Sequence, residues 1–182
     1  MDVVDRIVPE PAQLALSPHE AQGIVELCVV AAAADGPVTR AVYKQLTYIV
    51  GRVRSLVRSG LPNANATSAD QAVSPEGPYR SAAMPVDARV RSVPLPPGAL
   101  DSLLEEVAEV GWRDRMWTVS ESLDREVVRR LAFQLSLVLV LRDVNMSEDE
   151  LELVKKLRSA LRIERDEADA LMAKVVMSSG GT

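Results

Sequence analysis

The 182-residue sequence predicts an all-α fold from its composition, its helix-start motifs and the spacing of its apolar residues. Apolar residues make up 47% of the chain, which is ample material for a core, yet only 3% of the chain is aromatic. Cores that are rich in alanine, leucine and valine but poor in rings are typical of packed helices, whereas β-sandwiches favour aromatic and β-branched side chains. Apolar residues three and four positions apart recur along the chain, as amphipathic helices require.

The first predicted helix begins at Ser17-Pro18-His19-Glu20, a capping box with proline at the first helical position. The residues that follow are apolar on nearly every side as far as Asp35-Gly36, which indicates a buried helix. Thr39 then caps a second helix, whose apolar positions from Val42 to Val57 keep the 3/4 spacing up to Gly60. The short connection predicts that the two helices are antiparallel.

Four more helices are predicted in the second half of the chain, for a total of about six. The third covers Leu100–Val110, whereas residues 112–121 show no clear period and stay unassigned. Leu123–Arg142 could form a strand or a helix, because its part Leu-Ser-Leu-Val-Leu-Val-Leu also shows the two-residue alternation of a strand. The length of the segment and its i,i+4 charge pairs favour a helix. Ser147-Glu148-Asp149-Glu150 is a second capping box, which opens a helix through Leu161. The last helix spans Glu164–Met177.

The distribution of the prolines along the chain indicates its domain organisation. Seven of the eleven prolines lie in residues 61–97, a stretch without sustained periodicity that we interpret as a proline-rich inserted loop or linker. Residues 17–60 and 98–177 then form a single helical domain. Residues 1–16 are an N-terminal extension, and residues 178–182 are expected to form a flexible tail.

Composition excludes several classes of function. The net charge of −5 is spread without a concentrated basic segment, so nucleic acid is not an expected partner. One cysteine, Cys28, and one histidine, His19, rule out a disulfide framework and any metal centre built from several Cys or His ligands. We therefore expect a protein that is not an enzyme. Because we see neither a signal peptide nor a transmembrane segment, we expect it to be cytoplasmic.

Two of the connections between predicted helices, which we call the first and the second joint, share a sequence pattern. The first reads Ala34-Asp35-Gly36-Pro37-Val38-Thr39 and the second Arg142-Asp143-Val144-Asn145-Met146-Ser147, so both are Asp-x-x-apolar-(Ser/Thr). In each case the aspartate follows a buried helix, whose carbonyl end disfavours an anion. The side chain is therefore expected to bond the amides of the next loop or to meet a cation.

This repeated helix–Asp–turn–cap–helix pattern resembles the TerB family of tellurite-resistance proteins and their TerB-like relatives. The resemblance covers about residues 17–60 and 122–177. It implies a compact helical bundle with two internally repeated helical hairpins, a role in stress or tellurite resistance, and adaptor function near membranes or larger assemblies. It also implies that clustered acids bind a divalent cation, calcium or magnesium, with Asp35, Asp143 and Glu150 as candidate ligands. In the first joint Val42 replaces the glutamate that the second joint keeps as Glu150.

A structural interpretation of these acids stays open beside the chemical one. Asp35 and Asp143 are then turn residues, since aspartate side chains commonly bond nearby backbone. Glu150 then closes the capping box that begins at Ser147.

A basic face of the second helix is the candidate surface for a partner. Arg40, Lys44, Arg54 and Arg58 share one broad side of that helix. Such a face is either merely solvated, or it binds an acidic protein partner or the anionic surface of a membrane. The leading functional hypothesis is a non-enzymatic TerB-like interaction or scaffold module in a bacterial stress-related or envelope-proximal assembly. The alternatives are a divalent-cation-binding sensor and a subunit of a homomeric assembly that self-associates.

Overall fold

A computed structural model describes residues 3–34, 36–57, 98–141 and 147–179, and these residues form eight α-helices. No β-strand occurs in this part of the chain, where an isolated bridge joins Leu16 to Val57. The prediction of an all-α fold is therefore confirmed. In chain order the helices are α1 (Val3–Ile7), α2 (Pro18–Ala34), α3 (Arg40–Ser55), α4 (Ala99–Val110), α5 (Trp112–Glu121), α6 (Glu126–Val140), α7 (Glu148–Ala160) and α8 (Arg165–Ser179).

The described residues contain two helices more than the sequence predicts. Helix α1 lies within the predicted N-terminal extension, and its five residues are too few to show a period. Helix α5 occupies the unassigned residues 112–121. The predicted insertion, residues 61–97, lies outside the described residues.

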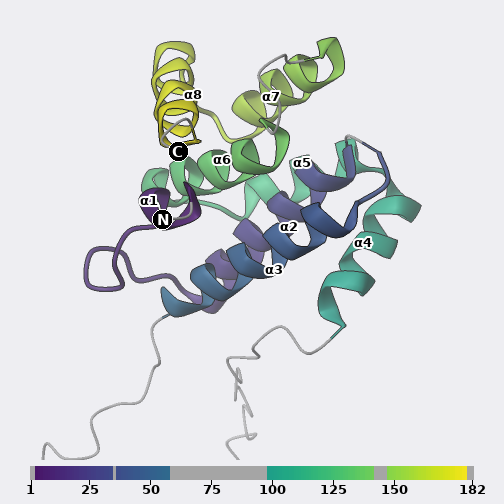
Figure 1. Cartoon of the computed structure of the whole chain (residues 1–182), viewed down its shortest axis with the longest axis horizontal. Coiled ribbons are helices and arrows are strands. Elements are labelled where there is room, and N and C mark those ends of the chain that lie inside the picture. Colours follow the sequence, from purple (N-terminus) through teal and green to yellow (C-terminus); the bar gives the residue numbers. More distant parts are fainter. Residues whose placement is uncertain (1–2, 35, 58–97, 142–146, 180–182) are drawn as a thin grey trace, which may run out of the picture.

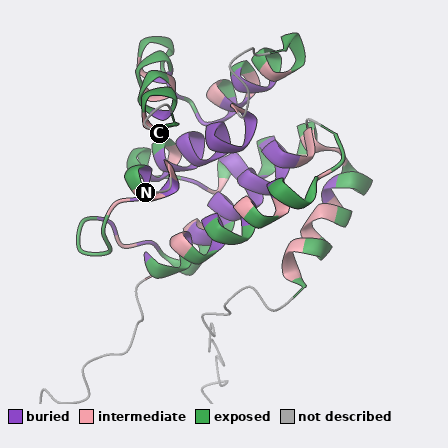
Figure 2. Ribbon diagram, in the orientation of Figure 1, coloured by how far each residue is buried: buried purple, intermediate pink, exposed green. Residues whose placement is uncertain are grey.

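Helices α2 and α6 form the centre of the molecule, and the other helices surround them (Figure 1). Figure 2 shows that both are buried over most of their surface. Eleven of the 17 residues of α2 and eleven of the 15 residues of α6 are buried, and Leu27, Phe133 and Leu135 are fully enclosed. The alternating part of the predicted segment Leu123–Arg142 belongs to α6, a helix that is covered on nearly every side and is therefore apolar. The competing strand interpretation is wrong.

Among the described residues, no helix combines the length and the apolar character that crossing a membrane would require.

The predicted capping box at the start of α2 is confirmed. The backbone N–H of Ser17 donates to Glu20 Oε2 at 2.8 Å, and the backbone N–H of Glu20 donates to Ser17 Oγ at 3.2 Å. Arg125, which precedes α6, donates to Glu20 Oε2 and to the carbonyl of Ala15, both at 2.8 Å. Burial raises the pKa of Glu20, but the hydrogen bonds from Arg125 and Ser17 outweigh that effect and hold the pKa below its ordinary value. One carboxylate thus joins the beginnings of both central helices.

A second ion-pair network positions α4 and α5. Arg115 of α5 places Nη2 2.7 Å from Glu26 Oε2 of α2 and Nη1 2.9 Å from Glu106 Oε1 of α4. Gln22 also donates to Glu26 Oε1 at 2.8 Å. Only 8% of the Glu26 side chain is exposed, so its charge depends on Arg115 for compensation.

Candidate partner-binding surface

One side of α3 forms an open groove of about 620 Å³ with basic and aromatic side chains. The opposite side of α3, which includes Leu46, Ile49 and Val53, is buried in the core. Thr39 fixes the start of the helix as predicted, since its Oγ1 accepts from the backbone N–H of Val42 at 3.4 Å. We call the residues that line the groove the α3 surface: Arg40, Tyr43, Lys44, Thr47, Tyr48, Gly51 and Arg52.

Carboxylates from two neighbouring helices hold the aromatic side chains of the α3 surface. The Tyr48 hydroxyl donates to Asp5 Oδ1 of α1 at 2.7 Å, and Arg52 Nε lies 3.1 Å from the same oxygen. On the other side, a hydrogen bond to Asp101 of α4 raises the pKa of the Tyr43 hydroxyl. Between them Gly51 leaves open space, since no atom lies within 4 Å of where a Cβ would be.

Two cations of the α3 surface have no acidic partner in the part of the chain that the structure describes. Arg40 and Lys44 are both exposed, and they lie one helical turn apart. No carboxylate of the described residues forms an ion pair with either of them, whereas Arg52 is paired with Asp5. Their charges are therefore available to a ligand, and so are the donors that they carry.

The structure brings together some of the predicted partner-binding residues. Arg40 and Lys44 both line the groove. Arg54 is exposed in the last turn of α3 but does not line the groove, and Arg58 lies outside the described residues.

Sequence reasoning missed the other members of the α3 surface: Tyr43, Thr47, Tyr48, Gly51 and Arg52. The helical period supplied a signal for most of them, because positions three, four, seven, eight and eleven after Arg40 share its side of a helix. Arg52 carries no such signal, since its place depends on the ion pair with Asp5, which is distant in the sequence.

The candidate metal ligands are not brought together in what the structure describes. Asp35 and Asp143 lie outside the described residues. Glu150 closes the predicted capping box, because its Oε2 accepts from the backbone N–H of Ser147 at 2.7 Å while its own N–H donates to Ser147 Oγ at 3.2 Å. The described residues contain no group of three or more His, Cys, Asp or Glu side chains arranged to hold a metal ion.

Replacing Ser147 by alanine should lower the free energy of unfolding by about 0.5–2 kcal/mol, because the first turn of α7 loses its cap. The loss should be the same with chelator and with millimolar calcium or magnesium, as followed by urea denaturation. Ser159→Ala, the same change at an exposed position near the end of α7, should have little effect. A cation-dependent rise in melting temperature that Glu150→Gln abolishes would instead favour a metal-binding role.

The single histidine and the single cysteine of the chain lie apart from the groove. His19 is exposed in the first turn of α2. Cys28 is fully buried, and burial raises the pKa of its thiol to about 12, despite the opposing effect of the Ser136 side chain. The thiol therefore stays protonated at neutral pH and acts as a small apolar side chain.

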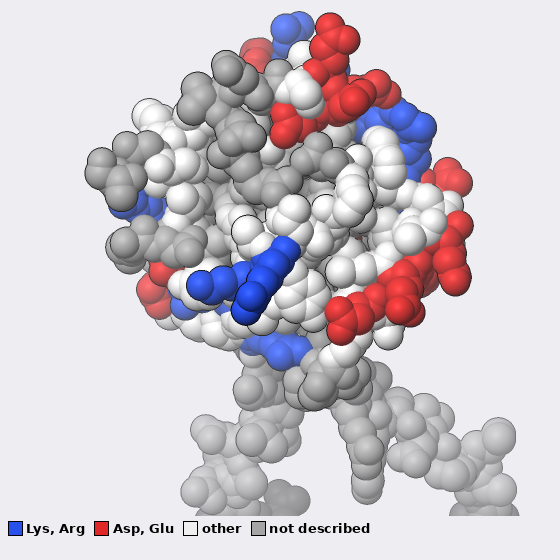
Figure 3. Space-filling view, turned by 45° about the vertical axis from the view of Figure 1, so that its right-hand side comes forward, with Lys and Arg blue, Asp and Glu red and all other residues white. Residues whose placement is uncertain are grey.

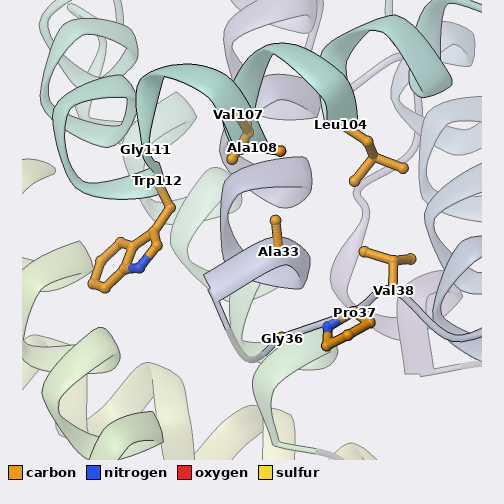
Figure 4. A pocket seen from close by; sticks show the side chains of 9 residues that line it. All are labelled: Ala33, Gly36, Pro37, Val38, Leu104, Val107, Ala108, Gly111 and Trp112. Atoms are coloured by element: carbon orange, nitrogen blue, oxygen red, sulfur yellow. The ribbon is translucent and has the colours of Figure 1, made fainter.

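An apolar hollow of about 370 Å³ lies between the connection from α2 to α3 and helix α4. Figure 4 shows Leu104 and Val38 on opposite sides of it, with Trp112 at one end. The Trp112 ring is held by two cations, the Arg113 guanidinium at 4.8 Å and the Lys156 ammonium at 5.4 Å from its centroid. The residues that line the hollow are Ala33, Gly36, Pro37, Val38, Leu104, Val107, Ala108, Gly111 and Trp112.

Comparison with known proteins gave no match: no family model, no curated protein and no solved structure is significantly similar to this chain. A proposal about function therefore rests on the sequence pattern and on the geometry of the α3 surface.

Proposed function

We propose that this chain is a non-enzymatic, TerB-like interaction module that binds an acidic protein surface through the α3 surface. The bacterial stress-related or envelope-proximal setting of this proposal comes from the resemblance of the two Asp-x-x-apolar-(Ser/Thr) joints to those of TerB-like proteins.

The observation that carries this proposal is the pair Arg40 and Lys44, which have no acidic partner among the described residues and line a groove that also presents tyrosines. Tyrosine and arginine are enriched at protein interfaces, where an aromatic body supplies contact area and a polar end supplies hydrogen bonds. Tyr48, with 39% of its surface exposed, is one such side chain. Opposite charge on the partner would guide association and fix its orientation.

The test is affinity capture from the cells that naturally produce the protein, with the wild type compared with Arg40→Glu/Lys44→Glu. The double variant should retain the specific partner at least about tenfold less, because two attractive contacts become repulsive. The captured protein is then purified and its binding measured directly by calorimetry, together with binding of vesicles of anionic lipid.

A matched control makes the result specific to the α3 surface. Arg165→Glu/Lys174→Glu changes the net charge by the same amount at exposed positions of α8, and it should bind the partner like the wild type. If both double variants lose partner binding equally, binding depends only on the net charge of the chain and not on the α3 surface. Binding of the vesicles without any acidic protein would replace the protein partner by a membrane surface.

A further inference from the structure

The α3 surface has a counterpart of opposite charge on the same side of the molecule. On α4, Glu105 and Glu109 are exposed, and no cation of the described residues forms an ion pair with either. They lie four positions apart, which is the spacing of Arg40 and Lys44 on α3, so the two members of each pair lie one helical turn apart on one side of their helix.

Two observations place these pairs on adjoining surfaces. The carboxylate of Asp101, one helical turn before Glu105, is near enough to Tyr43 of the α3 surface to raise the pKa of the Tyr43 hydroxyl. The apolar hollow lies between the connection that precedes α3 and the later turns of α4, because Val38 and Leu104 both line it. Figure 3, which brings the α4 side of Figure 1 forward, shows basic side chains near the middle of this face, acidic ones to their right and uncharged ones between.

From this arrangement we infer that a second copy of the chain docks on the α3 surface, with its α4 acids against Arg40 and Lys44. The inference rests on the proposed function, since it names the partner of the same surface. A two-fold axis through the apolar hollow would place the basic pair of each copy against the acidic pair of the other. The interface would then contain two identical sets of contacts between a basic pair and an acidic pair.

Apolar side chains between the charges supply the centre of this interface. Leu100, Leu103 and Leu104 of α4 are only partly buried, and Val110 is 53% exposed. An interface with an apolar centre and a charged rim is the usual arrangement between protein subunits. A second copy would cover the part of these side chains that packing on the core of their own chain leaves exposed.

Sedimentation equilibrium of purified full-length chains tests this inference by charge exchange. The wild type should form a reversible dimer. Arg40→Glu/Lys44→Glu alone and Glu105→Lys/Glu109→Lys alone should each be monomeric at the same concentration, because like charges face each other twice. An equimolar mixture of the two variants should form a mixed dimer, in which both sets of contacts are opposite in charge again.

Circular dichroism checks that each variant is folded, and mixing Glu105→Lys/Glu109→Lys with the control Arg165→Glu/Lys174→Glu should give no mixed dimer. A monomeric wild type, a dimer that survives either reversal, or two variants that stay apart on mixing would overturn the inference. The proposed function fails separately, when Arg40→Glu/Lys44→Glu captures the same cellular proteins as the wild type.

Discussion

Leu135→Ala is expected to lower the free energy of unfolding by about 2–5 kcal/mol. Leu135 is fully buried in α6, the helix that packs most extensively on α2, so its removal leaves a cavity at the centre of the molecule. The cost combines the lost burial of the side chain with the loss of contacts around that cavity. Urea denaturation followed by circular dichroism measures the change.

Val127→Ala is the control on the same helix. The Val127 side chain is 46% exposed, and its truncation should change the free energy of unfolding by less than about 0.5 kcal/mol. Equal effects at the two positions would contradict the placement of α6 in the core.

Arg115→Met is expected to cost about 3–5 kcal/mol, because it removes the cation from a buried carboxylate. Glu26, with its side chain 8% exposed, would keep its bond to Gln22 but lose the guanidinium at 2.7 Å. The same change frees Glu106 and loosens the attachment of α5 to α4. Chemical denaturation measures the loss.

Two further variants separate the buried charge from other effects of the substitution. Arg113→Met removes an exposed arginine of α5 that lies 3.9 Å from Glu152, and it should cost at most about 1 kcal/mol. In the double variant Glu26→Leu/Arg115→Met no unpaired charge remains buried, because Glu106, which also loses Arg115, is 44% exposed; much of the stability should therefore return. If the double variant is no more stable than Arg115→Met, the buried charge is not the cause.

The parts of the fold that local chemistry determines could be predicted from the sequence. The capping boxes at Ser17 and Ser147 and the cap at Thr39 need only residues three positions apart, and all three form as expected. The beginnings of α2, α3 and α7 follow from them, whereas α3 ends at Ser55, before the predicted end at Gly60.

Helices α1 and α5 could not be predicted because contacts distant in the sequence stabilise them. Helix α1 has five residues and packs on α3, α6 and α8, where Arg6 donates to the Ser178 carbonyl at 2.9 Å. Helix α5 buries only Met116, Val119 and Ser120, and its place depends on the Arg115 network. An isolated five-residue helix is too short to be stable in water.

The candidate surface, like the fold, could be predicted only where local sequence spacing determines it. Arg40 and Lys44 could be placed on one side of a helix from spacing alone. The neighbouring side chains Tyr48 and Arg52 interact with Asp5 of α1, and Asp101 of α4 raises the pKa of Tyr43; these acids meet the α3 surface only in the folded chain. The helical period therefore finds the two cations but not these acidic neighbours.

Site-specific photo-crosslinking in the cells that naturally produce the protein tests the central claim most directly. A photoreactive residue at Thr47, in the middle of the α3 surface, is compared with one at Ala170, exposed on α8. The account predicts a higher-mass adduct from Thr47, none from Ala170, and loss of the Thr47 adduct in the Arg40→Glu/Lys44→Glu background. No adduct from Thr47, or one that survives the charge reversal, would contradict it.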